Sequence, residues 1–394
     1  MLLVRLTENG QTIGSSELDE INSMSDRSIQ SQLRSARDSL FEEEMFHELA
    51  RESRILSSLN ILMRGSTLYV PVKGFTGNSV SSEQSESQQL EISLVAAVDR
   101  DQDKQKLPRD QLSQSIASFL RVLFCEAHRQ KSRQRTQLPI PLSEVKRQTP
   151  PLPLLRPLLN HVQHYDAVKS TKILLKSMRQ ILKSAGLEID LDINYELTLS
   201  GIAQQILNRN NGESSTADRL LKQLMSPLNG KVVVSLPSFS DCREYRGSLD
   251  IVISTYLASP SFGTTYRLKI PPSLAIILFN EGPVAKHLTF DDFADLSDYI
   301  LFLYEVDLAH HLVTMESSGW APEDKWPELS RSYGSHGAKT KLAIQFLPNK
   351  LNLLVRSAEA AESITLGSWD GFSGKDSFKT AISQYSRSYP VGDK

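Results

Sequence analysis

Residues 38–64 read DSLFEEEMFHELARESRILSSLNILMR, and this stretch decides how we interpret the rest of the chain. Neither glycine nor proline occurs from Ser15 to Arg64, so the sequence predicts a long helix, with Gly65 as the first residue suited to end it. Apolar residues three and four positions apart form two stripes on nearly opposite faces. The first stripe comprises Ile29, Leu33, Ala36 and Leu40, and the second comprises Phe41, Met45, Leu49, Leu56, Leu59 and Met63.

Two opposed apolar stripes cannot both be buried against one neighbour of the helix. We therefore expect the helix either to break near Asp38 or to contact different partners along its length. Charged residues surround the second stripe, as they do along heptad-based helical interfaces. The alternative interpretation is an ordinary core helix of a single domain.

The composition is that of a globular protein long enough for two or three domains. Of its 394 residues, 40% are hydrophobic and 23% are charged. The net charge of -2 and the pI near 6.5 provide no global attraction for nucleic acid or an anionic membrane. Cys125 and Cys242 are too few for a disulfide framework or a four-cysteine zinc site. No signal peptide or membrane span is predicted, so we expect a soluble intracellular protein.

The first part of the chain is predicted to form a helical bundle with an inserted β-hairpin. Residues 1–27 are polar and weakly patterned, although MLLVRL resembles a strand. Strands around 68–72 and 90–94 enclose a polar loop. A second helix follows Pro108, and its wide apolar face suits antiparallel packing on the first helix. This face comprises Leu112, Ile116, Phe119, Leu120, Leu123, Phe124 and Ala127.

Basic residues and prolines follow the second helix. Arg129, Lys131, Arg133 and Arg135 complement the helix dipole, and a nuclear import signal is the alternative interpretation. Six prolines between Pro139 and Pro157 predict an extended linker. The predicted divisions are a polar segment (1–27), a long-helix bundle with a hairpin (28–137), a linker (138–157) and an α+β region (158–394). The predicted fold class is therefore α+β.

The C-terminal region begins with a basic amphipathic helix, predicted over 158–185. Lys169, Lys172, Lys176, Arg179 and Lys183 share one face, which is either solvated or docks on an acidic partner or a phosphate backbone. Strands are predicted over 187–199, 231–237, 248–257, 264–270 and 274–279. A helix is predicted from Asp291 to Glu316, followed by a hairpin that turns at Pro348-Asn349.

No set of residues in the sequence satisfies the requirements of a catalytic site. Asp291, Asp292 and Asp295 form the DDxxD pattern that binds magnesium in terpenoid synthases, but they also suit the first turn of a helix. A magnesium-dependent enzyme is therefore a minor alternative. The pairs His161 with His164 and His310 with His311 could supply two metal ligands, yet a third is missing. We expect no cofactor.

Several stretches together resemble a known family. LFEEEMFHELARES, QLEISLV, SIASFLRVLFCEAHRQ and PPLPLLRPLLNHVQHYDAV occur in the order seen in subunit 17 of the Mediator complex. AIILFNEGPVAKHLTFDDFADLSDYILFLYEVDLAHHLVTMESSGW also resembles that family, particularly its fungal members. The similarity spans about 33–320. The N-terminal region is shorter than is usual in the family, through a short isoform, a truncated gene model or divergence.

This resemblance implies a nuclear, non-enzymatic coactivator subunit. It would assemble other Mediator head-module subunits through its long helices and help connect regulators to RNA polymerase II. No membrane contact is expected, and a nucleic-acid-binding module using the basic helix is the alternative function. The predicted partner interface comprises Phe41, Met45, Leu49, Leu56, Leu59, Met63, Leu112, Ile116, Phe119 and Leu123.

Overall fold

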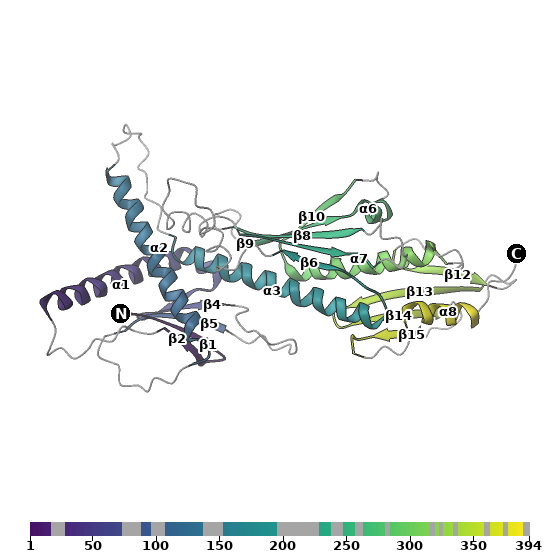
Figure 1. The fold of residues 1–394 in the computed structure, drawn as a ribbon, viewed down its shortest axis with the longest axis horizontal. Helices are drawn as coiled ribbons and strands as arrows, with labels where there is room; N and C mark the ends of the chain where they lie inside the picture. The colour runs from purple at the N-terminus through teal and green to yellow at the C-terminus, as the bar shows by residue number, and fades with distance from the viewer. Residues whose placement is uncertain are drawn as a thin grey trace. The chain divides into compact units, whose positions relative to one another are not determined.

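The described part of the chain has an α+β fold with three five-stranded sheets. Figure 1 shows its helices and strands. The computed structural model describes residues 1–16, 28–72, 88–95, 107–136, 153–194, 228–237, 247–256, 263–279, 284–314, 320–322, 326–333, 338–357, 363–372 and 377–388. Its chain divides into two compact units. Unit 1 is Met1–Asp166, Ile202–Ser226 and Tyr256–Phe262, and unit 2 is Ala167–Gly201, Pro227–Thr255 and Gly263–Lys394.

Unit 1 is built on one antiparallel sheet. Its strands are β1 (Leu2–Glu8), β2 (Gln11–Ser15), β3 (Leu62–Arg64), β4 (Thr67–Pro71) and β5 (Gln88–Leu94). They lie in the order β2-β1-β5-β4-β3. The two strands predicted as a hairpin, β4 and β5, do pair with each other, but the sheet that contains them is larger than predicted.

The strand β1 corrects our interpretation of the first residues as weakly patterned. Leu2, Val4 and Leu6 are fully buried, as expected for alternate residues that face a core. The strand pairs with β5 along its whole length, from Leu2 opposite Leu94 to Glu8 opposite Gln88. Because its partner is so distant in sequence, local pattern alone could not place β1 inside a sheet.

The first long helix, α1 (Ile29–Ile55), is continuous through Asp38 but shorter than predicted. Ser28 caps it by accepting a hydrogen bond from the Ser31 N–H. Beyond α1, a single 3₁₀ turn ends at Asn60, which adopts the left-handed conformation with φ 58°. Asparagine tolerates this conformation better than most residues, so it ends the helical segment before Gly65.

Two further long helices are α2 (Asp110–Thr136) and α3 (Leu155–Ser184). In the described part of the chain, α1 and α2 meet between residues 41–44 and 121–128. Figure 1 shows that the two helices cross there, so the expected antiparallel pair is not formed. Most of the predicted linker lies outside the described residues, and α3 begins within its last three positions.

Unit 2 contains the other two sheets. In the order β10-β9-β8-β7-β6, one sheet comprises β6 (Leu191–Asn194), β7 (Leu228–Ser235), β8 (Ser248–Tyr256), β9 (Gly263–Ile270) and β10 (Lys286–Phe290). The other comprises β11 (Ala321–Pro322), β12 (Leu329–Tyr333), β13 (Ala338–Leu347), β14 (Lys350–Ser357) and β15 (Ser363–Trp369), in chain order. The predicted late hairpin is confirmed, since β13 and β14 pair antiparallel across the turn at Pro348-Asn349.

The helices of unit 2 are the rest of α3, α6 (Pro272–Phe279), α7 (Phe293–Thr314) and α8 (Phe378–Ser388). The strand predicted over 274–279 is wrong, because this run forms α6. Pro272 occupies the first helical position, where proline is favoured, and a short apolar run does not distinguish a buried helix from a strand.

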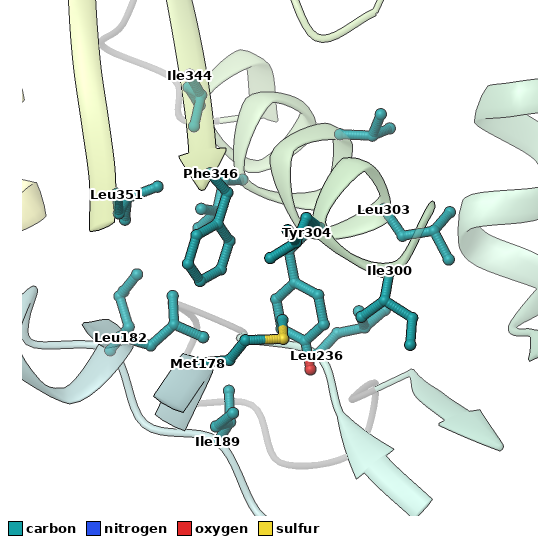
Figure 2. Packing of buried hydrophobic residues seen from close by; sticks show 14 of the residues in the cluster. Met178, Leu182, Ile189, Leu236, Ile300, Leu303, Tyr304, Ile344, Phe346 and Leu351 are labelled. Carbon is teal, nitrogen blue, oxygen red and sulfur yellow. The ribbon is translucent and has the colours of Figure 1, made fainter. Parts of the chain in front are cut away.

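The helix α7 joins the two sheets of unit 2. On one side the Tyr304 hydroxyl donates to the Ser235 carbonyl of β7 at 3.2 Å, and on the other the Glu305 carboxylate accepts the Phe346 N–H of β13 at 2.6 Å. Figure 2 shows Tyr304 among apolar side chains from α3, α7, β13 and β14, with Leu236, which directly follows β7, close by. This shared core is what holds the second unit together.

Candidate partner interface

The second half of α1 is buried against its own unit. Met45 and Leu49 have no exposed surface, and Leu56 is 6% exposed. These side chains belong to a cluster that includes Ile116 and Leu123 of α2. Burial of each such side chain contributes about 1.5–3 kcal/mol. This face of α1 therefore supports the fold of unit 1.

The remaining predicted interface residues lie at the margin of this cluster or outside it. Phe41, Leu59, Leu112 and Phe119 are partly buried against the cluster. The rings of Phe41 and Phe124 meet edge to face, with their centroids 4.9 Å apart.

Met63 is not on a helix, which corrects its assignment to the second stripe. It lies in β3, opposite Leu68 of β4, and is 42% exposed. The helical spacing counted from Leu59 to Met63 carries no meaning there, because the chain has already left the helical conformation at Asn60.

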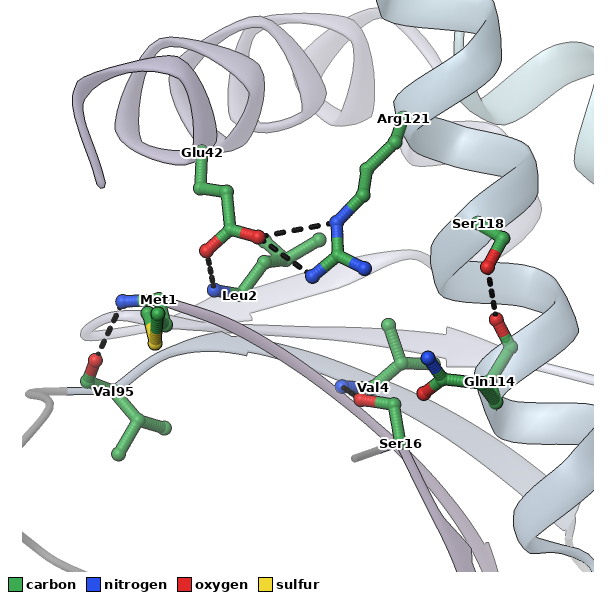
Figure 3. A network of polar contacts seen from close by, with 9 residues as sticks. All are labelled: Met1, Leu2, Val4, Ser16, Glu42, Val95, Gln114, Ser118 and Arg121. Atoms are coloured by element: carbon green, nitrogen blue, oxygen red, sulfur yellow. Dashed lines mark hydrogen bonds and ion pairs between the residues drawn. The ribbon is translucent and has the colours of Figure 1, made fainter. Parts of the chain in front are cut away.

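Glu42 connects three elements of unit 1 through one buried carboxylate. Its Oε2 accepts the Leu2 N–H of β1 at 2.8 Å, and its Oε1 accepts the Arg121 guanidinium of α2 at 2.6 Å (Figure 3). The Glu42 side chain is only 9% exposed. A charge-assisted hydrogen bond in such a place is stronger than a neutral one. The carboxylate thus fixes where α1, α2 and the sheet meet.

Glu52 caps a helix that begins about a hundred residues later. Its carboxylate accepts the N–H groups of Leu154, Leu155 and Arg156 at 2.6, 2.7 and 3.2 Å. These groups belong to the first turn of α3, whose N–H donors have no partner within the helix and whose dipole favours an anion. Burial raises the pKa of Glu52, while the three N–H donors and Arg156 oppose that rise.

The sequence contains a signal for both carboxylates that our first interpretation missed. Glu42, Met45, Leu49, Glu52 and Leu56 follow one another at intervals of three, four, three and four residues. At 100° per residue they share one face, so the two acids occupy core positions rather than solvated flanks. An acid at a core position of a heptad pattern indicates a buried polar contact.

The first half of α1 leaves its apolar stripe in solvent. Ile29 is 76% exposed, and Leu33 and Leu40 are each 65% exposed. Their spacing, completed by the exposed Ala36, is the repeat that one helix uses to pack against another. Arg37 is exposed beside it. Together these residues form an exposed apolar surface with a cationic neighbour, here called the α1 stripe.

The residues predicted as a basic face do lie along α3. Lys176, Arg179 and Lys183 are exposed, whereas Lys169 and Lys172 are partly buried. All five belong to unit 2. In the basic tract at the end of α2, the side chains of Arg133 and Arg135 lie outside the described part of the chain.

The acids of the DDxxD segment stand at the start of α7. Asp292 Oδ1 accepts the Ala294 N–H at 3.3 Å, and Asp295 lies in the first helical turn. This is the capping arrangement that a helix dipole favours. Across the residues with described structure, no group of three or more His, Cys, Asp or Glu side chains could hold a metal ion.

The paired histidines make packing contacts. The His161 ring meets the Phe119 ring edge to face, with centroids 5.7 Å apart. Burial, followed by the neighbouring His161, lowers the pKa of His164 to about 4, so it is neutral near pH 7. Within the part of the chain that the structure describes, no helix is both long and apolar enough to span a bilayer.

Taken together, the packing and the polar contacts define an α+β protein whose charged side chains hold its elements together. Residues 1–181 match the family described as subunit 17 of the Mediator complex. The chain belongs to this family. The similarity agrees with the expectation drawn from the helix and hairpin stretches of the first half.

Fungal proteins named "Mediator of RNA polymerase II transcription subunit 17" are similar over much of the chain. The protein from Aspergillus oryzae is 30% identical over 270 residues, which are 68% of this chain and 38% of that protein. The protein from Neosartorya fischeri is 26% identical over 393 residues, which are 98% of this chain and 55% of that protein. The chain thus spans about half the length, or less, of these curated relatives.

Proposed function

We propose that this chain is a non-enzymatic scaffold subunit of the Mediator complex in the nucleus. It assembles other head-module subunits and thereby helps to connect regulators to RNA polymerase II. The observation that carries this proposal is the α1 stripe, because a continuous helix buries one face in its own unit and leaves a second, heptad-spaced face exposed.

The partner interface of this proposal is centred on the α1 stripe, with Met63 and the margin of the unit 1 cluster as further contacts. Met45 and Leu49 support the stripe from the opposite side of the helix, since they have no surface to offer a partner. The partner is a helix of another subunit whose apolar residues interlock with Leu33 and Leu40. An acidic residue on its flank would pair with Arg37.

A proline-rich linker over 138–157, whose last three residues open α3, would connect a helix-rich region at 28–137 to an α+β region at 158–394. Five of its six prolines precede α3 and favour an extended, stiff segment. The basic tract from Arg129 to Arg135 would serve nuclear import in addition to complementing the helix dipole.

Affinity purification of the tagged chain from nuclear extract tests the proposal. We expect Mediator subunits, identified by mass spectrometry, to co-purify in amounts comparable to the bait. Their absence, with the bait intact and nuclear, would contradict the assignment of a scaffold role.

A further inference from the structure

The part of α3 that lies in unit 2 carries positively charged residues but no negatively charged ones. Residues 167–184 contain five lysines and arginines and neither aspartate nor glutamate. The five cations, Lys169, Lys172, Lys176, Arg179 and Lys183, follow at intervals of three and four residues and therefore form a single row. We call this row the α3 ridge. In the described part of the chain, no carboxylate forms an ion pair with Lys176, Arg179 or Lys183.

The α3 ridge does not stabilise its own helix over most of its length. The helix dipole favours cations only in the last turn, where Lys183 lies. In the rest of the row, which precedes Lys183, like charges three and four residues apart repel one another, and each pair costs a few tenths of a kcal/mol. A row of this kind is better explained by an anionic partner.

An exposed aromatic side chain stands beside the ridge. Phe372 is 93% exposed, and its N–H donates to Asp370 Oδ1 at 2.9 Å. The preceding Gly371 adopts φ +89° and lies against α3: its N–H donates to Ser184 Oγ at 3.2 Å. A Cβ atom on Gly371 would stand 3.4 Å from the Cβ of Gln180. The loop therefore places the exposed Phe372 directly after a residue that contacts α3 at Gln180 and Ser184, which follow Arg179 and Lys183 of the ridge in sequence.

On α3 itself, Ile173 adds apolar surface close to the cations. It is 38% exposed and follows Lys172 directly, in the same turn as Lys176. Cationic and apolar groups thus alternate within one short stretch of surface.

We infer that this surface binds an acidic amphipathic segment of another protein, with carboxylates on the α3 ridge and apolar side chains on Phe372 and Ile173. Nucleic acid is the less suitable partner. The net charge of -2 gives the chain no long-range attraction for a polyanion, and the exposed apolar surface of Phe372 and Ile173 suits apolar side chains of a peptide. The inference goes beyond the proposed assembly role, which depends on α1 in unit 1.

Fluorescence anisotropy with the full chain tests this inference. The probe is a short labelled peptide in which leucine and glutamate occupy opposite faces of a helix, and a leucine and lysine peptide of the same length is its control. We expect saturable binding of the acidic peptide at low ionic strength and none of the basic one. Binding of both peptides alike would overturn the inference.

Two variants distinguish the ridge from general electrostatics. Replacement of Lys176, Arg179 and Lys183 by Gln should weaken peptide binding about tenfold, and Phe372→Ser should weaken it about threefold. The control variant replaces Arg5, Arg64 and Arg267, which are exposed elsewhere, by Gln and removes the same charge. Equal binding by the ridge variant and the control variant would contradict the inference.

A labelled oligothymidine strand serves as the nucleic-acid probe in the same assay. We expect it to bind more weakly than the acidic peptide and to be unaffected by Phe372→Ser. Tighter binding of the strand than of the peptide would overturn the choice of partner. These assays measure peptide binding to unit 2, so the peptides can fail to bind while Mediator subunits still co-purify. Equally, the peptides can bind while Mediator subunits do not co-purify.

Discussion

The carboxylate of Glu52 accepts the N–H of Leu154 at 2.6 Å, across 102 residues of sequence. One residue of α1 thereby provides a hydrogen-bond acceptor for the backbone N–H groups at the start of α3. The side chain of this residue, Glu52, is 1% exposed. A helix end that is buried without such a partner would leave several backbone donors unsatisfied. The Glu52 carboxylate therefore helps to fix the position of α3 relative to α1 within unit 1, together with the apolar residues that both helices contribute to the unit 1 cluster.

Replacement of Glu52 should destabilise unit 1 strongly. Glu52→Ala removes the acceptor of three N–H groups and should lower the free energy of unfolding by about 3 kcal/mol, whereas Glu52→Gln keeps one acceptor and should cost about half as much. The exposed Glu43 of the same helix is the control, and Glu43→Ala should change the free energy of unfolding by less than about 0.5 kcal/mol. Urea unfolding followed by circular dichroism measures the difference. Similar costs at both positions would refute the capping role.

The pair of Glu42 and Arg121 should show a large coupling energy. In a double-mutant cycle with alanine we expect about 1–3 kcal/mol, because the carboxylate is buried and the guanidinium is the partner that α2 supplies. The pair of Glu126 and Arg129, in which the Arg129 side chain is 41% exposed and the charged atoms lie 3.6 Å apart, is the control and should couple by less than about 0.5 kcal/mol. Thermal unfolding of the four forms of each cycle gives the two coupling energies, and equal couplings would show that burial of Glu42 is unimportant.

Asp307 should make the stability of unit 2 depend on pH. Burial raises its pKa from 3.8 to about 7. Since the folded pKa exceeds the unfolded one, the protonated acid favours folding below about pH 4, and this contribution is lost as the pH rises through 7. A shift of this size corresponds to ~4 kcal/mol at most, and residual contact with solvent reduces it to about 2 kcal/mol.

The variant Asp307→Asn should therefore be more stable than the native chain at pH 8 and equally stable at pH 4. Asp298→Asn is the control, because Asp298 is exposed on the same helix. Denaturant unfolding at both pH values measures the difference. A native chain that gained stability relative to Asp307→Asn between pH 4 and pH 8 would show that the sign is wrong.

The sequence was most informative where a period repeated over many residues. The spacing of Met45, Leu49 and Leu56 predicted the buried face of α1, and the opposed stripe at Leu33 and Leu40 is indeed on the other side. The late hairpin that turns at Pro348-Asn349 was also predicted correctly. Such patterns reflect local geometry, which a sequence records directly.

The errors have physical causes of two kinds. Local signals competed at the end of α1, where Asn60 took the role expected of Gly65, and in α6, where Pro272 favoured a helix over a strand. Contacts between distant residues were invisible: Glu52 could be assigned to Leu154 only from the fold. For the interface, the pattern identified the stripes but not which of them the chain covers itself.

The most direct test of the central claim places a charge in the α1 stripe. The tagged variant Leu33→Glu with Leu40→Glu is purified from nuclear extract beside the native chain, and the co-purifying Mediator subunits are quantified by mass spectrometry. A control variant, Ser31→Glu with Ser35→Glu, adds the same charge on the opposite side of the helix. Because both leucines are 65% exposed, thermal stability should change little.

We predict that the stripe variant loses about nine tenths or more of the co-purifying subunits. The control variant and the native chain should retain them, and all three should unfold at similar temperatures. Undiminished recovery of Mediator subunits with the stripe variant would contradict the claim that the exposed face of α1 is the surface on which partners assemble.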